Sequence, residues 1–217
     1  MTERVVELFP EVARVAADLV RHPSVAARWA DESACAGMTV GGLANHLAGQ
    51  AANVVLLFAE AASDAAPISV VEHYRRAAWV HTGLDGEANI AVRTSADGYA
   101  ESGPADLDQR VTADLAALPP TLAPLLAGER DPDTVLIPGQ GWSLSSADFV
   151  LTRTMEVLVH SDDLAASVGV DTPRFPDEAA DAVLALLASV AAERHGQAAV
   201  LRALSRPQRA AGPVSAF

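Results

Sequence analysis

Residues 154–164 read Thr154-Met155-Glu156-Val157-Leu158-Val159-His160-Ser161-Asp162-Asp163-Leu164. Glu156 and His160 stand four residues apart, so on a helix they share one face and can reach one cation. Their neighbours at 157–159 are apolar, and an unpaired charge in such a run is costly. The stretch therefore predicts a helix in which a further group balances the charge of Glu156 and His160. A metal ion is the leading candidate for that group.

The helix that carries this pair has clear limits in the sequence. Ser145, with Asp148 three residues later, predicts a capped start, and Gly169 predicts the end. At roughly 100° per residue, one stripe of this helix holds Phe149, Arg153, Glu156, His160 and Asp163. The opposite side, which we expect to face solvent, holds Thr154, Ser161 and Ala165. Leu151 and Leu158 indicate that the helix is covered on most sides, so the pair should point inward.

Most of the remaining chain has helical periodicity as well. Apolar residues recur at helical spacing over 5–20, 39–62, 69–82, 106–118, 177–194 and 198–205. Prolines 119, 120 and 124 should end the fourth of these segments. The span 85–104 has no clear pattern, residues 134–137 predict one short strand, and the tail from 207 should be irregular. The fold class is therefore all-α, a helical bundle whose short loops favour antiparallel neighbours.

Composition narrows the classes of function. The chain has 217 residues, half of them apolar, which suits one domain with an appendage. Its formal net charge of −13 argues against a nucleic-acid partner. Cys35 is the single cysteine, which excludes a disulfide framework and a cysteine-rich zinc site. The sequence contains neither a signal-like start nor a membrane-spanning apolar run, so we expect a soluble, cytoplasmic protein.

A third ligand for the expected metal lies in the segment after Thr39, a plausible N-cap. His46 shares a helical stripe there with Gln50 and Asn53. His46, Glu156 and His160 together would supply two nitrogens and one oxygen, and would leave a position for water or substrate, as catalytic metal sites do. Such ligands suit zinc, nickel or iron(II), with zinc as the leading candidate.

Two segments resemble the mycothiol-dependent maleylpyruvate isomerase and DinB-like group of four-helix metalloproteins. The first is the Thr-Val, spacer, His-Leu pattern that ends at His46-Leu47, and the second is the Glu-x-x-x-His-x-x-Asp-Leu-Ala pattern over 156–165. The resemblance covers roughly residues 5–170 and implies that His46, Glu156 and His160 bind the metal. We therefore expect a DinB-like up-down four-helix bundle over 1–170 and a helical extension over 171–217 that packs on it.

The resemblance also implies an activity. It predicts a metal-dependent enzyme that uses a low-molecular-weight thiol, with mycothiol as the candidate, on an electrophilic substrate in an isomerase or S-transferase reaction, as a monomer or homodimer. The chain departs from the family pattern at Met38 and Gly41-Gly42. The isomerase carries a separate carboxyl-terminal α/β domain, whereas we expect the residues after Gly169 to form helices. A non-catalytic metal- or ligand-binding module, a metal-dependent hydrolase and a purely structural bundle stay open as alternatives.

Several neighbouring residues have two interpretations. Asp163, one turn after His160, can fix the imidazole tautomer or bind a nearby loop. Arg153 can clamp a substrate carboxylate or, as we favour, pair with Asp148. On the predicted helix 69–82, a common face holds His73, Arg76 and His81; we favour a solvated face over a substrate-binding role.

Cys35 precedes the helix that carries His46. A lone cysteine is more often a small buried hydrophobe than a nucleophile, and we favour that interpretation.

Overall fold

A computed structural model describes residues 2–60, 63, 65–83 and 85–217. The helices are α1 (Thr2–Val20), α2 (Pro23–Ala27), α3 (Val40–Ala59), α4 (Val70–Arg76), α5 (Ala78–His81), α6 (Glu87–Ala100), α7 (Gly103–Leu126), α8 (Ser146–Val168), α9 (Asp177–His195) and α10 (Gln197–Ser205). A short 3-10 turn follows at Pro207–Arg209. Strands β1 (Thr134–Leu136) and β2 (Ser143–Ser145) form a small antiparallel hairpin.

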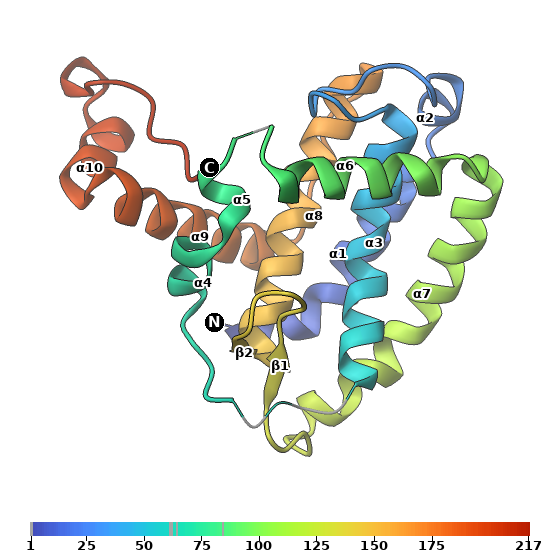
Figure 1. Ribbon diagram of the computed structural model, residues 1–217, viewed down its shortest axis with the longest axis horizontal. Coiled ribbons are helices and arrows are strands. Elements are labelled where there is room, and N and C mark those ends of the chain that lie inside the picture. The colour runs from blue at the N-terminus through green and yellow to red at the C-terminus, as the bar shows by residue number, and fades with distance from the viewer. Residues whose placement is uncertain (1, 61–62, 64, 84) are drawn as a thin grey trace.

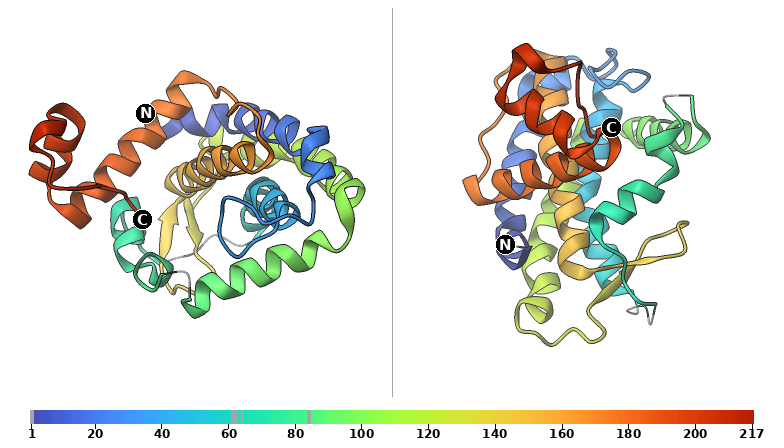
Figure 2. Two further views of the ribbon diagram at one scale, coloured as in Figure 1. Left: turned by 90° about the horizontal axis from the view of Figure 1, so that it is seen from above. Right: turned by 90° about the vertical axis from the view of Figure 1, so that its left-hand side faces the viewer.

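Four long helices, α1, α3, α7 and α8, form the bundle (Figures 1 and 2). Their facing sides are lined by fully buried aliphatic and aromatic side chains, which include Phe9, Val12, Leu43, Leu47, Leu118, Leu122, Val157 and Leu164. The predicted all-helical four-helix bundle is therefore confirmed. The burial of these apolar faces is the main force that holds the helices together.

The long connection between α3 and α7 sets the direction of the bundle helices. It contains α4, α5 and α6 and returns the chain to the end of the bundle where α3 begins (Figure 1). As a result α3 and α7 run in the same direction, and Asn45 near the start of one accepts a hydrogen bond from Arg110 near the start of the other at 2.6 Å. α8 runs antiparallel to α3, with His46 beside His160 and Gln50 beside Arg153.

Helix α8 begins and ends where the sequence predicts. The Ser145 hydroxyl accepts a hydrogen bond from the Asp148 backbone N–H at 3.1 Å, which caps the first turn. Gly169 ends the helix in the left-handed conformation at φ 70°, which glycine adopts without steric cost. The expected solvent face is wrong: α1 and α9 also pack on this helix, so it is covered on that side, where the fully buried side chains are Thr154, Ser161 and Ala165.

Helix α3 begins where Thr39 caps it, because the threonine hydroxyl accepts a hydrogen bond from the Gly42 N–H at 2.9 Å. It ends at Ala59, and residue 62, where the sequence predicted its end, lies outside the described residues. The start of the helix is closely packed. A Cβ atom at Gly41 would lie 2.5 Å from the Trp29 indole, which only glycine avoids.

Three elements differ from the sequence prediction. Residues 87–100 lie in the span without a clear sequence pattern, and they form helix α6. Its only buried side chains are Ala96 and Ala100, so no apolar stripe marks it. The predicted helix over 69–82 divides at Ala77 into α4 and α5. A second strand, β2, pairs with the predicted first one.

The prolines of α7 do not end it. Pro119, Pro120 and Pro124 lie inside the helix, which continues to Leu126. All three are exposed on its outer side, where water can satisfy the carbonyl groups that proline leaves unpaired.

The segment after α8 packs on the bundle. Helix α9 lies against α1, α8 and α4, and α10 folds back on α9 at the edge of the molecule (Figure 1). The final residues return towards α4 and α5, where the Phe217 ring lies 5.2 Å from Tyr74 and 5.0 Å from Trp79 between centroids. The division into 1–170 and 171–217 stays a prediction. None of the described helices combines the length and apolar character that crossing a membrane requires.

Candidate metal centre

Helices α3 and α8 bring His46, Glu156 and His160 together. One ligand atom from each lies within 4.8 Å of the others. Glu156 Oε2 is 3.1 Å from His160 Nε2 and 3.5 Å from His46 Nε2. Ligands that surround a tetrahedral zinc at 2.0–2.2 Å are about 3.4 Å apart, so the two distances from Glu156 are close to those around such an ion. That these residues bind a metal stays a prediction.

The ionisation of Glu156 and that of His160 depend on each other. Burial opposes ionisation of Glu156, but hydrogen bonds from His160 and His46 outweigh it and hold the pKa of the carboxyl well below its usual range. Burial likewise opposes protonation of His160, but hydrogen bonds to Asp163 and Glu156 raise its pKa to about 9. Without a metal, therefore, the charge of Glu156 is compensated by the imidazolium of His160.

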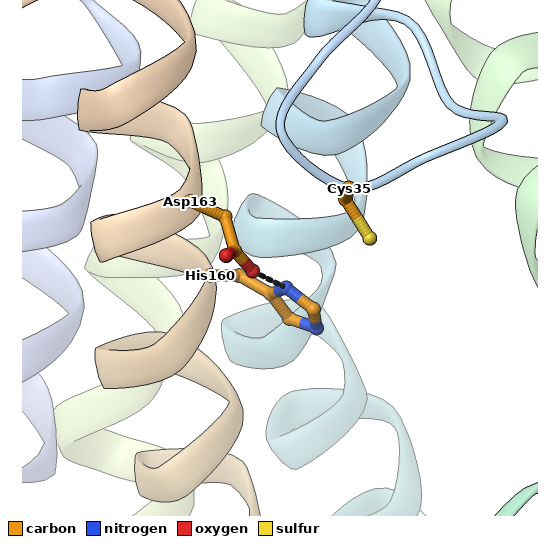
Figure 3. A group of neighbouring side chains, drawn as sticks. All are labelled: Cys35, His160 and Asp163. Carbon is orange, nitrogen blue, oxygen red and sulfur yellow. Dashed lines mark hydrogen bonds and ion pairs between the residues drawn. The ribbon is translucent and has the colours of Figure 1, made fainter. Parts of the chain in front are cut away.

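Asp163 holds the far side of the His160 ring. The Nδ1–H of His160 donates to Asp163 Oδ2 at 3.0 Å, as Figure 3 shows. This hydrogen bond places the proton of the neutral ring on Nδ1. The lone pair of Nε2 then points towards Glu156 and the proposed metal position. A carboxylate behind a histidine in this way is the usual support of a metal ligand.

Gln50 links the cluster to Arg153, a contact that the sequence analysis did not predict. The Gln50 side-chain amide donates to the His46 carbonyl at 2.9 Å and lies 3.4 Å from His46 Nε2. Its carbonyl accepts from Arg153 Nη1 at 2.8 Å. The i, i+4 spacing of His46 and Gln50 was the available signal. The favoured pairing of Arg153 with Asp148 is wrong, because Arg153 bonds Gln50 and stacks over Phe149.

Cys35 lies on the loop before α3 and beside the cluster. Its sulfur is within 4.8 Å of ligand atoms of His160 and Asp163 (Figure 3). Burial and the Asp163 carboxylate both raise the pKa of the thiol, so it is protonated at neutral pH. A protonated thiol is a poor nucleophile, which agrees with its interpretation as a small hydrophobe, although the side chain is only half-buried.

The predicted solvated face of helix α4 is wrong for His73. His73 is buried, and the Trp142 indole N–H donates to its Nδ1 at 3.1 Å. Burial and the Arg153 charge lower the pKa of His73 to about 4, so the ring is neutral. Arg76 and His81 are exposed, as expected, and Arg76 pairs with Glu72.

The family comparison agrees with this geometry. The family model described as the mycothiol maleylpyruvate isomerase N-terminal domain matches residues 9–165, which include His46, Glu156 and His160. No curated protein and no solved structure matches the chain. The family match covers well over half of the sequence, and the all-helical bundle agrees with it. The chain therefore belongs to the mycothiol maleylpyruvate isomerase N-terminal domain family.

Proposed function

We propose that this protein is a metal-dependent enzyme that uses a low-molecular-weight thiol on an electrophilic small molecule, in an isomerase or S-transferase reaction. The observation that supports the proposal is the cluster of His46, Glu156 and His160, with donor atoms within 4.8 Å of one another. Three protein ligands leave a position for an exogenous group, which favours a catalytic over a structural metal site. Zinc is the leading candidate, and nickel or iron(II) suits the same ligands.

The residues of the cluster have distinct tasks in this proposal. His46, Glu156 and His160 would hold the divalent ion, which lowers the pKa of a coordinating thiol. Asp163 keeps the proton of His160 on Nδ1, so that Nε2 can bind metal. Gln50, held by Arg153, restrains the helix turn that presents His46.

The printed name of the family couples mycothiol to maleylpyruvate isomerisation, and we carry mycothiol over as the proposed thiol. In an isomerisation the thiolate would add to an activated double bond and later leave, so that the thiol is regenerated. In a transfer the new carbon–sulfur bond would remain in the product, so that the thiol is consumed. Thiol balance during turnover therefore separates the two reactions.

The test combines metal analysis with thiol-dependent turnover. Wild type should bind stoichiometric metal and should convert electrophiles only in the presence of thiol, whereas His46→Ala and His160→Ala should lose both metal and turnover. His81→Ala is the matched control, because His81 is exposed and its ring hydrogen-bonds only the Arg75 carbonyl among the described residues.

Other results would replace the proposal. Metal without thiol-dependent turnover would indicate a binding module, and hydrolysis independent of thiol would indicate a hydrolase. If the wild-type protein holds no metal and chelation leaves its stability unchanged, both metal-based interpretations are wrong.

A further inference from the structure

Cys35, His160 and Asp163 form a second group of possible metal ligands next to the candidate metal centre (Figure 3). One ligand atom from each lies within 4.8 Å of the others, and all three side chains are partly exposed. Cys35 comes from the loop before α3, and the other two come from α8. This group supplies one sulfur, one nitrogen and one oxygen, whereas the candidate metal centre supplies two nitrogens and one oxygen.

Hydrogen bonds fasten the Cys35 loop to α8. The backbone N–H of Ala34 donates to Ser167 Oγ at 2.8 Å, and this hydroxyl donates to the Asp163 carbonyl at 2.6 Å. Ligands of a tetrahedral ion, with sulfur at 2.3 Å and nitrogen or oxygen at 2.0–2.2 Å, are about 3.4–3.6 Å apart. The separations of at most 4.8 Å exceed this by roughly 1.3 Å or less. Rotation of the Cys35 side chain can supply a movement of that size while its loop stays in place.

The two groups of ligands share His160, whose ring lies between two carboxylates. Its Nε2 is 3.1 Å from Glu156 Oε2, and its Nδ1 is 3.0 Å from Asp163 Oδ2. An ion held by His46 and Glu156 would take Nε2, and Asp163 would keep the proton of Nδ1. An ion held by Cys35 and Asp163 would take Nδ1, and Glu156 would accept the proton of Nε2. Either arrangement leaves the second ring nitrogen hydrogen-bonded, so His160 can serve an ion on either side.

Ligand type and charge distinguish the two positions. A thiolate favours soft, thiophilic ions, whereas imidazole and carboxylate suit harder ones. A bound divalent ion deprotonates a coordinating thiol, so Cys35 would release its proton to solvent and bind as the thiolate. Cys35 and Asp163 would then carry two negative charges, which balance a divalent ion, whereas Glu156 carries one.

We propose that Cys35, His160 and Asp163 form a second metal-binding position, selective for thiophilic divalent ions, which competes with the candidate metal centre for His160. Only one of the two positions can then be filled at a time. A thiophilic ion in the second position removes a ligand from the first. The inference does not rest on the proposed function, because it requires neither turnover nor a thiol substrate.

Cadmium(II) is a suitable probe, because a cadmium–thiolate bond absorbs in the ultraviolet and Cys35 is the single cysteine of the sequence. Titration of the full chain, with a phosphine as reductant in place of a thiol, should give an absorption that saturates at one equivalent. Cys35→Ser should abolish the absorption and leave the circular dichroism spectrum unchanged. His160→Ala and Asp163→Asn should each weaken cadmium binding by more than about tenfold, because each removes a ligand. Asp162→Asn, at the exposed neighbouring position, is the matched control and should leave it unchanged.

His46→Ala separates this inference from the proposed function. The substitution removes a ligand of the candidate metal centre only, so it should lower the affinity for zinc and retain the cadmium–thiolate absorption. Retained absorption in a protein that shows no thiol-dependent turnover would leave the second position standing although the proposed function had failed. Native mass spectrometry in the presence of both metals should find one ion per chain.

Four results would overturn the second position as proposed. The first is absence of a saturable absorption in wild type. The second is loss of the absorption in His46→Ala, which would make Cys35 a fourth ligand of the candidate metal centre. The third is unchanged cadmium affinity in His160→Ala and Asp163→Asn, which would mean that the cysteine binds the ion by itself. The fourth is two ions per chain, which would refute the competition for His160.

Discussion

At the scale of single residues, the proposed role of His160 as a metal ligand depends on the carboxylate of Asp163, which lies behind its ring. Asp163 accepts the Nδ1–H of His160 at 3.0 Å, and it thereby keeps the opposite nitrogen free for a metal. The same bond adds negative charge close to the proposed ion, which strengthens its binding. We therefore expect Asp163 to contribute to the affinity for the proposed metal ion without touching it.

Asp163→Asn should lower metal affinity by about 10–100-fold, the usual cost of losing such a support. Competition with a chromophoric chelator measures the affinity directly. Asp162→Asn is the matched control, because the neighbouring Asp162 is exposed and accepts only from Thr172 among the described residues. Equal losses in the two variants would show that general surface charge, rather than the hydrogen bond to His160, determines the affinity.

The lowered pKa of His73 predicts that the stability of the protein depends on pH. Burial and Arg153 lower its pKa from 6.5 to about 4, so the folded state resists protonation more than the unfolded state does. Between about pH 4 and 6.5 the unfolded chain therefore binds more protons than the folded one. The contribution of neutral His73 to the free energy of unfolding is complete above pH 6.5. It decreases as the pH falls from 6.5 to about 4, by at most about 3 kcal/mol.

His73→Asn removes this titration but retains an acceptor for the Trp142 indole. Urea unfolding of both proteins across this pH range should show a steeper loss of stability in wild type on the acid side. Parallel curves for the two proteins would mean that His73 does not remain neutral in the folded state.

At the scale of elements, local signals predicted the helices that carry the candidate metal centre. Ser145 and Thr39 mark helix starts through hydrogen bonds to backbone N–H groups three residues later, and Gly169 marks a helix end through its left-handed backbone conformation. The i, i+4 spacing of Glu156 and His160 has the same local origin. Helix α6 was missed because its surface is mostly exposed, and tertiary contact rather than periodicity holds it in place.

Contacts between distant segments were beyond a pattern-based prediction. His73 is buried because Trp142, from the turn between the two strands, covers it. Gln50 is oriented by Arg153, 103 positions later in the chain. Such pairings depend on the crossover through α4–α6, which no local periodicity specifies.

The close packing at the start of α3 gives a prediction at this scale. Alanine normally favours a helix over glycine by about 1 kcal/mol. At Gly41, however, the added Cβ would lie 2.5 Å from the Trp29 indole, which is held by a 2.9 Å hydrogen bond to the Ala100 carbonyl. Gly41→Ala should therefore destabilise the protein by about 1–3 kcal/mol.

Gly49 in the same helix is the control for this substitution. A Cβ there would meet nothing within 4 Å, so Gly49→Ala should stabilise the protein by up to about 1 kcal/mol. Urea denaturation of the two variants measures both effects. Stabilisation by both alanines would show that Trp29 can move away at little cost.

At the scale of the whole molecule, the extension after α8 is joined to the bundle through an apolar face. Helix α9 lies against α1 and α8 of the bundle and against α4, which carries His73 and Tyr74. The buried side chains of α9 are Ala179, Ala182, Val183, Leu186, Val190 and Ala191. Burial of this kind couples the unfolding of packed elements, so we expect the extension and the bundle to unfold together.

Two leucines of α9 test that coupling. Leu186 is 4% exposed and Leu184 is 63% exposed, although they are two positions apart. Leu186→Ala should lower the free energy of unfolding by about 2–4 kcal/mol, through lost burial and a residual cavity. Leu184→Ala should change it by less than about 0.5 kcal/mol. Circular dichroism and tryptophan fluorescence should report one coincident transition in both variants. If Leu186→Ala produces a separate early transition and leaves the main one in place, the residues after Gly169 fold as an independent unit and do not stabilise the helices that carry the candidate metal centre.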